Sequence, residues 1–137
     1  MPFDYHHVVR FHETDGAGVV YFANGLVICH SAYEASLTAT GISPQTFFRA
    51  SPLAFPIVHA SIDFHRPLRC GDAVTIRLTP IRVGEHSYEI HYRLGWDPVD
   101  KPAATALTRH VCIDGDRRQR RPLPPNMERW LTQWGEP

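Results

Sequence analysis

The stretch TDGAGVVYFANGLVICHSAYEASLTATG, residues 14–41, predicts a tight turn that leads into one long helix. Gly16 and Gly18 beside Asp15 are typical of turn chemistry. Gly41 is suited to end the helix. The other helix faces carry few strongly polar side chains, so we expect the helix to be embedded rather than on the outside. From Phe22 onward, apolar residues recur at the three- and four-residue spacing of a helix face: Leu26, Cys29, Tyr33 and Leu37.

The remainder of the chain is patterned as a series of strands. Apolar and polar residues alternate over 58–65, 74–79 and 87–94, and weaker patterns cover 6–13 and 104–113. Pro80 predicts a bulge or an edge at its position. One strand, one helix and about four further strands with short connections indicate an α+β fold. In that fold an antiparallel sheet of about five strands wraps around one long central helix.

The length of the chain is typical of a single domain. With 137 residues, 43% of them apolar, it can bury one ordinary core, and we predict one domain over residues 1–137. No internal repeat or linker is evident. We assign residues from about 114 onward to a C-terminal tail, which closes with a short helix around Met127–Trp134.

Charge and cysteine content exclude several classes of protein. A formal net charge of zero argues against a nucleic-acid or anionic-membrane partner. The three cysteines are widely spaced and form no C-x-x-C pair, which fits neither a disulfide framework nor a zinc ribbon and favours a reducing, cytoplasmic location. The first residues lack the layout of a signal peptide, and no apolar run is long enough to cross a membrane. We therefore expect a cytoplasmic protein without membrane insertion.

Two motifs carry a resemblance to a known family. TDGAGVVYFAN at 14–24 and RPLRCGD at 66–72 resemble the hot-dog thioesterases of the 4-hydroxybenzoyl-CoA type, and the likeness covers most of residues 5–115. Within that family, HASIDF at 59–64 and HVCI at 110–113 make the chain similar to the cyanobacterial 1,4-dihydroxy-2-naphthoyl-CoA hydrolases of phylloquinone biosynthesis.

The resemblance implies a hot-dog fold and the hydrolysis of an aromatic acyl-CoA, here 1,4-dihydroxy-2-naphthoyl-CoA, to the free acid and CoA. It implies no cofactor, because coenzyme A is part of the substrate. It also implies a homo-oligomer, a dimer or a dimer of dimers (a homotetramer), with the active site between subunits.

Asp15 is the candidate catalytic residue. The residue alone is as well explained by a turn aspartate that bonds its own backbone. By resemblance, it acts either as a nucleophile that forms a mixed anhydride or as a general base on water. The first N–H groups of a helix have no internal partner, so the backbone of Phe22 and Ala23 is expected to polarise the thioester carbonyl.

The acyl pocket is expected to include Val19, Tyr21, His59 and Ser61. The last two lie with Asp63 and His65 on one face of the 58–65 strand, where a solvated face or a subunit contact is the plainer explanation. Residues two apart on one strand lie about 7 Å from each other, and no further cluster of ligands is evident in the sequence, so no metal site is predicted. His30, on the central helix, is expected to be a satisfied buried histidine.

Coenzyme A needs cations near the mouth of the site. The benzoyl-type relatives carry a basic cluster before the strand that matches Ser87 onward, whereas this chain has Gly84-Glu85-His86 there. Arg82, His86, Ser87 and the arginines between 117 and 121 are substitutes, with ordinary solvated surface as the alternative. The arginines lack a recognition helix or an aromatic platform for nucleic acid.

Two other functions stay open from the sequence. Fold and site motif do not fix the acyl group, so a thioesterase for short or medium aliphatic acyl-CoA is one alternative. A non-catalytic acyl-CoA-binding module is the other, although binding alone needs no carboxylate at Asp15.

Overall fold

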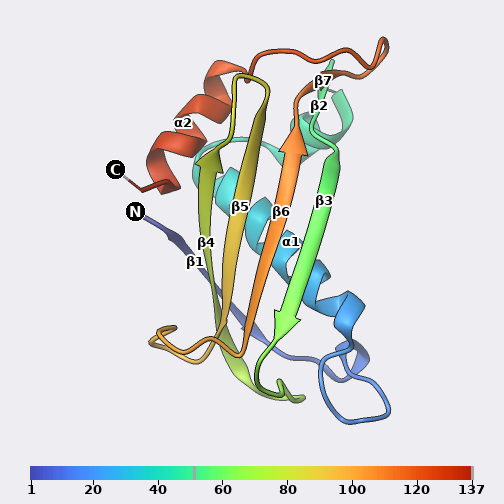
Figure 1. Cartoon of the computed structure of the whole chain (residues 1–137), viewed down its shortest axis with the longest axis vertical. Coiled ribbons are helices and arrows are strands. Elements are labelled where there is room, and N and C mark those ends of the chain that lie inside the picture. The colour runs from blue at the N-terminus through green and yellow to red at the C-terminus, as the bar shows by residue number, and fades with distance from the viewer. Residues whose placement is uncertain (51, 137) are drawn as a thin grey trace.

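A five-stranded antiparallel sheet with one long helix across one face organises the chain (Figure 1). The structure is a computed structural model that describes residues 1–50 and 52–136. The strand order is β1-β4-β5-β6-β3, and the long helix is α1 (Phe22–Ala39). The sheet strands are β1 (Phe3–Val8), β3 (Ile57–Phe64), β4 (Ala73–Arg82), β5 (Ser87–Gly95) and β6 (Ala104–Val111). The predicted fold class is confirmed.

Helix α1 packs on the sheet through the face that the sequence periodicity predicted. Cys29, Tyr33 and Leu37 are buried in the core. The outer side is not enclosed in a single chain, because Val27 is 58% exposed. The prediction of an embedded helix therefore holds for the side of α1 that packs on the sheet and not for its outer side, since in a single chain the sheet covers only one side of α1.

Gly25 sets how closely α1 approaches the edge strand β3. A Cβ at this position would lie 2.7 Å from Cδ1 of Ile62 and 2.9 Å from Cζ of Phe64. These distances are too short for a Cβ, so a larger residue there would require the side chains of Ile62 and Phe64 to move. Ile62 and Phe64 thus face α1, and by the two-residue period of a strand His59 and Ser61 face the other way.

The C-terminal end of α1 has a Schellman cap, as the prediction for Gly41 anticipated. Gly41 has φ +92°. Its N–H donates to the Thr38 carbonyl at 2.9 Å, and the N–H of Ile42 donates to the Leu37 carbonyl at 2.9 Å. These bonds satisfy carbonyls that a helix end would otherwise leave unpaired.

The last helix, α2 (Pro125–Trp134), is part of the core rather than the end of a loose tail. Met127 and Trp130 are fully buried, and the Trp130 indole N–H donates to Ser36 Oγ of α1 at 2.9 Å. The short helix itself was predicted. Its docking was not, because an amphipathic pattern does not say which surface it covers.

Two other regions differ from the sequence prediction, and one local prediction is confirmed. The first strand covers Phe3–Val8 rather than 6–13, and the chain turns through the short 3₁₀-helix η1 (Phe11–Glu13) before the glycine turn. The segment after α1 forms a π-helical turn, η2 (Thr46–Ala50), and the two-residue strand β2 (Leu53–Ala54), which pairs with β7 (Ile113–Asp114). Pro80 pairs with Ile90 of β5 but lies beyond the end of β1, so the predicted local edge is confirmed.

A polar cluster is buried between α1 and the sheet. The hydroxyls of Tyr33 and Tyr88 are 2.5 Å apart, and His110 stacks on Tyr88 with ring centroids 4.8 Å apart. His110 also bonds Thr108 Oγ1 at 2.9 Å. Burial lowers the pKa of His110 to about 4, so this ring is neutral at pH 7.

Candidate active site

Asp15 lies in a tight exposed loop directly before α1. Its N–H donates to the Val19 carbonyl at 3.0 Å, and its own carbonyl accepts from the Gly18 N–H at 2.9 Å. One carboxylate oxygen, Oδ1, accepts from the Ala17 N–H at 2.8 Å. The turn-aspartate explanation is therefore correct as geometry. Because one short bond occupies only part of the carboxylate, the other oxygen remains available for chemistry.

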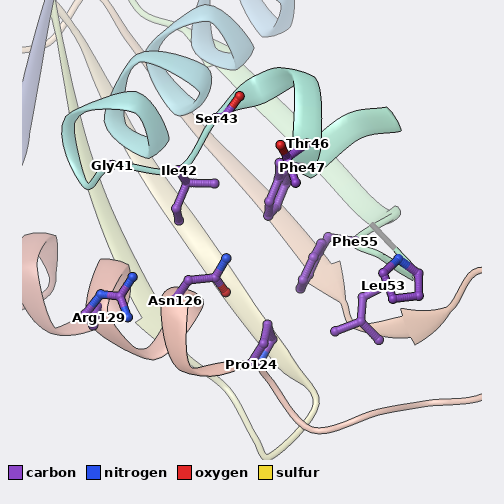
Figure 2. A pocket seen from close by; sticks show the side chains of 11 residues that line it. Gly41, Ile42, Ser43, Thr46, Phe47, Leu53, Phe55, Pro124, Asn126 and Arg129 are labelled. Carbon is purple, nitrogen blue, oxygen red and sulfur yellow. The ribbon is translucent and has the colours of Figure 1, made fainter. Parts of the chain in front are cut away.

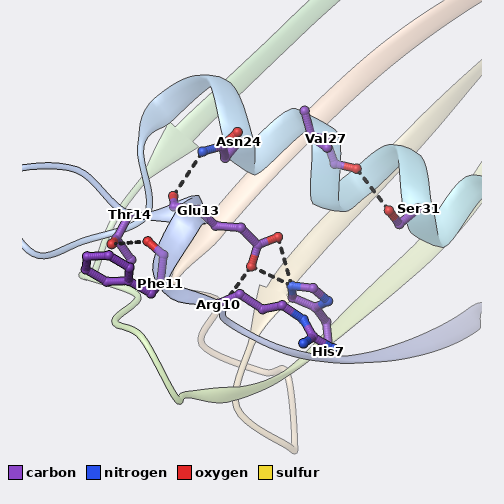
Figure 3. Close-up of polar contacts among 8 residues, drawn as sticks. All are labelled: His7, Arg10, Phe11, Glu13, Thr14, Asn24, Val27 and Ser31. Atoms are coloured by element: carbon purple, nitrogen blue, oxygen red, sulfur yellow. Dashed lines mark hydrogen bonds and ion pairs between the residues drawn. The ribbon is translucent and has the colours of Figure 1, made fainter.

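Glu13 anchors this loop to the first turn of α1 (Figure 3). Its buried carboxylate accepts from the Arg10 N–H at 2.7 Å and bonds His7 Nε2 at 2.9 Å. Burial raises the pKa of Glu13, but the Arg10 N–H and His7 outweigh it and hold the pKa below its ordinary value. The backbone carbonyl of Glu13 accepts from the Tyr21 N–H at 2.9 Å and from Asn24 Nδ2 at 3.1 Å. Asp15 is thus fixed relative to the helix it precedes.

Among the described residues, two backbone donors at the N-terminus of α1 have no protein partner. Tyr21 is the N-cap in an extended conformation and offers no side-chain cap. The Asn24 N–H donates to the Tyr21 carbonyl at 2.8 Å. Within residues 1–50 and 52–136, no acceptor pairs with the N–H of Phe22 or Ala23. These donors, at the positive end of the helix dipole, can hold an oxyanion.

A cavity of about 430 Å³ joins Asp15 to the start of α1. The predicted pocket residue Val19 lines it, and so does Phe22. Tyr21, also predicted, is exposed and packs against the Phe22 ring with centroids 4.7 Å apart, but it does not line the cavity. The other lining residues come from the loop and the segment after β3: Val20, Phe64, His65, Arg66, Pro67 and Leu68. The lining is mostly apolar and includes one arginine, Arg66. It therefore suits a ligand that has an apolar part and, at some distance from that part, an anionic group.

His59 and Ser61 do not meet Asp15 in a single chain. Both are exposed on the face of β3 that points away from α1, and neither lines the Asp15 cavity. Their face matches the solvated or subunit-contact explanation. His65, at the end of β3, does line the cavity, and its Nε2 bonds Thr105 Oγ1 at 3.1 Å.

The predicted coenzyme A residues lie at the opposite end of the sheet from the Asp15 loop (Figure 1). Arg82, at the end of β4, forms an ion pair with Glu128 and donates to the Gly84 carbonyl at 2.8 Å. His86 lies in the turn that precedes Ser87, the first residue of β5. Within one chain these residues cannot reach a substrate bound at Asp15, and the guanidinium of Arg82 is already paired.

Sequence reasoning missed the residues that build the walls and supports of the site. Arg66 and Leu68 belong to the RPLRCGD motif, which carried the resemblance but received no role. Glu13 directly precedes the motif TDGAGVVYFAN at 14–24, and Asn24 is the last residue of that motif. A signal existed for Arg66, because a cation is wanted near the mouth of the pocket. No pattern could pair Glu13 with His7, since the 3₁₀ turn that joins them was not predicted.

Other candidate groups have structural roles or none. His30 is only partly buried and bonds Glu34 Oε2 at 3.1 Å, so the prediction of a satisfied histidine is right and that of burial is wrong. Among the described residues, no three His, Cys, Asp or Glu side chains gather as metal ligands. None of the described helices has the length and apolarity needed to span a membrane.

Comparison with known proteins agrees with this geometry. Residues 9–131 match the family model of the thioesterase-like superfamily. A 1,4-dihydroxy-2-naphthoyl-CoA hydrolase from Nostoc punctiforme is 49% identical over 131 residues, which cover 96% of this chain and 87% of that protein. The enzyme of the same name from Trichodesmium erythraeum is 48% identical over 135 residues, 98% of each chain.

A solved structure supports the same assignment. The crystal structure of a 1,4-dihydroxy-2-naphthoyl-CoA thioesterase from Synechocystis superposes with a TM-score of 0.91 at 36% identity and covers 100% of both chains. The predictions of a hot-dog fold and of a thioester hydrolase are confirmed. The chain therefore belongs to the thioesterase-like superfamily and is a thioesterase with the hot-dog fold.

Proposed function

We propose that this chain hydrolyses 1,4-dihydroxy-2-naphthoyl-CoA to 1,4-dihydroxy-2-naphthoate and CoA. The observation that carries the proposal is one cavity that is lined by Asp15 and by Phe22, the first residue of α1. Among the described residues, the N–H groups of Phe22 and Ala23 at this helix end have no acceptor. The relatives with nearly half their residues identical are named for this substrate. No cofactor is required, since water and the thioester are the only reactants.

The reaction needs an attacking oxygen and a holder for the negative charge. The thioester carbonyl oxygen accepts from the N–H groups of Phe22 and Ala23 as the tetrahedral intermediate forms. Asp15 either takes a proton from water as the water oxygen attacks, or attacks the carbonyl carbon itself to form an anhydride. In both routes the C–S bond breaks and CoA leaves as a thiol after protonation. In the anhydride route water must then hydrolyse the anhydride, at the acyl carbon or at the Asp15 carbonyl carbon. Incorporation of ¹⁸O into Asp15 during single turnover in H₂¹⁸O would show the anhydride route with attack at Asp15, because the general-base route never exchanges the Asp15 oxygens.

The cavity divides into an acyl wall and a cationic mouth. Val19, Phe64 and Leu68 supply apolar surface for the aromatic acyl group. Arg66 is the arginine in the lining and is the proposed contact for a coenzyme A phosphate. In one chain the predicted residues Tyr21, His59, Ser61, Arg82, His86 and Ser87 do not line the cavity. His59 and Ser61, on the other face of β3, and the three residues at the far end of the sheet would reach substrate only through a second copy.

A homodimer through β3 is part of the proposal. Strand β3 pairs with β6 on one side, and no described strand pairs with its other edge. Beside that edge, Val58, Phe64 and Val27 are 58%, 40% and 58% exposed. An unpaired edge flanked by apolar side chains favours pairing with a second copy. Phe64 also lines the Asp15 cavity, so a partner at this edge would help to close it.

Light scattering with size exclusion tests the dimer. Val58→Asp is expected to yield monomers with reduced activity, whereas Val83→Asp, at another exposed valine in the β4–β5 turn, is expected to keep the wild-type assembly. A wild-type monomer with full activity would remove this part of the proposal.

The cytoplasm is the proposed location. Cys29, Cys70 and Cys112 are all free thiols, which suits a reducing compartment.

Release of free CoA thiol from a panel of acyl-CoAs tests the function. We expect kcat/KM to be highest for the hydroxynaphthoyl thioester and lower for benzoyl, hexanoyl and acetyl thioesters. A preference for the aliphatic substrates would replace the naphthoyl assignment with the aliphatic alternative. Binding without turnover of any substrate would favour the non-catalytic module.

A further inference from the structure

A second cavity lies at the opposite end of α1 from Asp15 (Figure 2). Its volume is about 370 Å³, and it forms where the segment after α1, η2 and the start of α2 meet. Helix α1 separates the two cavities by roughly 27 Å at the rise of an α-helix. Within one chain this cavity is therefore separate from the Asp15 cavity.

The apolar part of the cavity is built to receive a flat ring. Phe47 and Phe55 stack in parallel, with ring centroids 4.8 Å apart and an angle of 8° between the planes. Ile42 and Pro124 add to the apolar lining around them. Figure 2 shows these four side chains around an open centre. A planar aromatic ligand can continue the stack and cover apolar surface at the same time.

The polar part of the cavity comes from α2. Arg129 is exposed, and among residues 1–50 and 52–136 no acceptor bonds its guanidinium. The amide of Asn126 makes no hydrogen bond to the described residues from either atom, although its oxygen is shielded from solvent. A shielded amide oxygen without a donor is uncommon in a folded protein. Because the two residues are three apart on one helix, they lie on the same face.

We propose that this cavity binds a planar aromatic carboxylate that carries a ring hydroxyl. The carboxylate pairs with Arg129, whose planar fork matches it. The ring packs beside Phe55, and the hydroxyl satisfies the amide of Asn126 by donating to its oxygen or accepting from its nitrogen. The lining as a whole, apolar with a few fixed polar groups, has the character and size of a small-molecule site. The inference stands apart from the proposed reaction, since it uses none of the residues around Asp15.

Backbone amide NMR of the full chain tests the proposal with 6-hydroxy-2-naphthoate as the probe. This acid carries its hydroxyl far from its carboxylate and is not a thioester, so it cannot turn over. We expect saturable shifts at Ile42, Phe47, Asn126 and Arg129. An absence of shifts there, or shifts confined to residues around Asp15, would overturn the proposal.

Arg129→Gln and a control variant test the contact with the carboxylate. Arg129→Gln is expected to weaken binding at this cavity by about tenfold or more, whereas Arg120→Gln, at an exposed arginine outside the cavity, leaves it unchanged. Equal affinities for the two variants would contradict the carboxylate contact.

The hydroxyl contact is measured with 2-naphthoate, which lacks only the hydroxyl. Wild type is expected to bind 2-naphthoate several-fold more weakly than the hydroxylated acid, and Asn126→Leu is expected to bind both equally. The comparison between the two acids within one protein holds even if the variant is less stable. An equal preference in wild type and variant would show that Asn126 does not contact the hydroxyl.

Discussion

The two ends of α1 differ in how their backbone hydrogen-bonding groups are satisfied. At the C-terminal end, Gly41 and Ile42 satisfy the last carbonyls, and α2 covers the helix with Trp130. At the N-terminal end, the N–H groups of Phe22 and Ala23 have no partner within the described residues. We call the C-terminal end closed and the N-terminal end open. The closed end contributes stability, and the open end keeps its unpaired donors for a reacting group. The comparison predicts that substitutions at the first end change unfolding and those at the second change turnover.

The largest stability change is expected at the closed end. Trp130→Ala removes a fully buried ring that contacts Tyr33 and Tyr88 and donates to Ser36, which should cost about 3–5 kcal/mol of unfolding free energy. Urea denaturation measures this. Trp96→Ala, at a partly exposed tryptophan, should change stability by less than about 1 kcal/mol. The folded fraction of Trp130→Ala should keep its kcat, and a loss of kcat would break the division between the two ends.

A large turnover change is expected when a backbone donor is removed at the open end. Phe22→Pro removes the first helix N–H, and proline suits this position because no internal bond is lost. Phe22→Ala removes the ring but keeps the N–H. We expect kcat of the proline variant to be about 100- to 1000-fold below that of the alanine variant, as for the loss of one oxyanion donor. Equal kcat values in a steady-state thiol assay would show that this N–H does not hold the oxyanion.

The buried cluster beside the closed end should make stability depend on pH. An unfolded histidine has a pKa near 6.5. In the fold, burial lowers the pKa of His110 to about 4. Between these values the unfolded chain binds a proton that the folded chain does not, so stability falls as pH falls from 6.5 toward 4, by about 3 kcal/mol. Above pH 6.5 this contribution does not change.

The His110→Phe variant isolates that dependence. Its ring can keep the stack on Tyr88 but cannot take up a proton. Urea unfolding at pH 7, 5.5 and 4.5 should show a shallower loss of stability than in wild type. Identical slopes for the two proteins would mean that His110 is not the group responsible.

The smallest effects are expected from two glycines that share a backbone conformation. Gly18, in the Asp15 loop, and Gly41 have φ +79° and +92°, and an added Cβ would meet no atom within 4 Å at either site. Alanine should therefore cost about 1 kcal/mol at both positions through the backbone alone. Gly18→Ala should also lower kcat several-fold because it shifts Asp15, whereas Gly41→Ala should not. Thermal unfolding with the thiol assay distinguishes these outcomes.

Local patterns predicted most of the fold. The helix over Phe22–Ala39, its end at Gly41 and the central strands follow from periodicity and turn chemistry, which depend on neighbours in the sequence. The docking of α2 and the turn at Phe11–Glu13 were not predicted, because both depend on contacts between distant segments. The bond from Trp130 to Ser36 spans 94 residues and leaves no local signal.

The candidate site likewise contains residues that local sequence predicted and residues that only the fold could place. Asp15, Val19 and the start of α1 are adjacent in sequence, and the structure brings them together in one cavity. Arg66 reaches that cavity from the segment after β3, so only the fold could place it there. His59 and Arg82 were chosen by analogy with relatives, and in a single chain they lie on another face and at another end of the sheet.

Turnover of Asp15→Asn tests most directly whether the open end of α1 is a catalytic site. Asparagine keeps the shape of the side chain and can still accept from the Ala17 N–H, so stability should change little. Loss of the carboxylate should lower kcat for the hydroxynaphthoyl thioester by about 100- to 10,000-fold. Asp116→Asn, at another exposed aspartate, should match wild type. Equal kcat for Asp15→Asn and wild type would contradict the account.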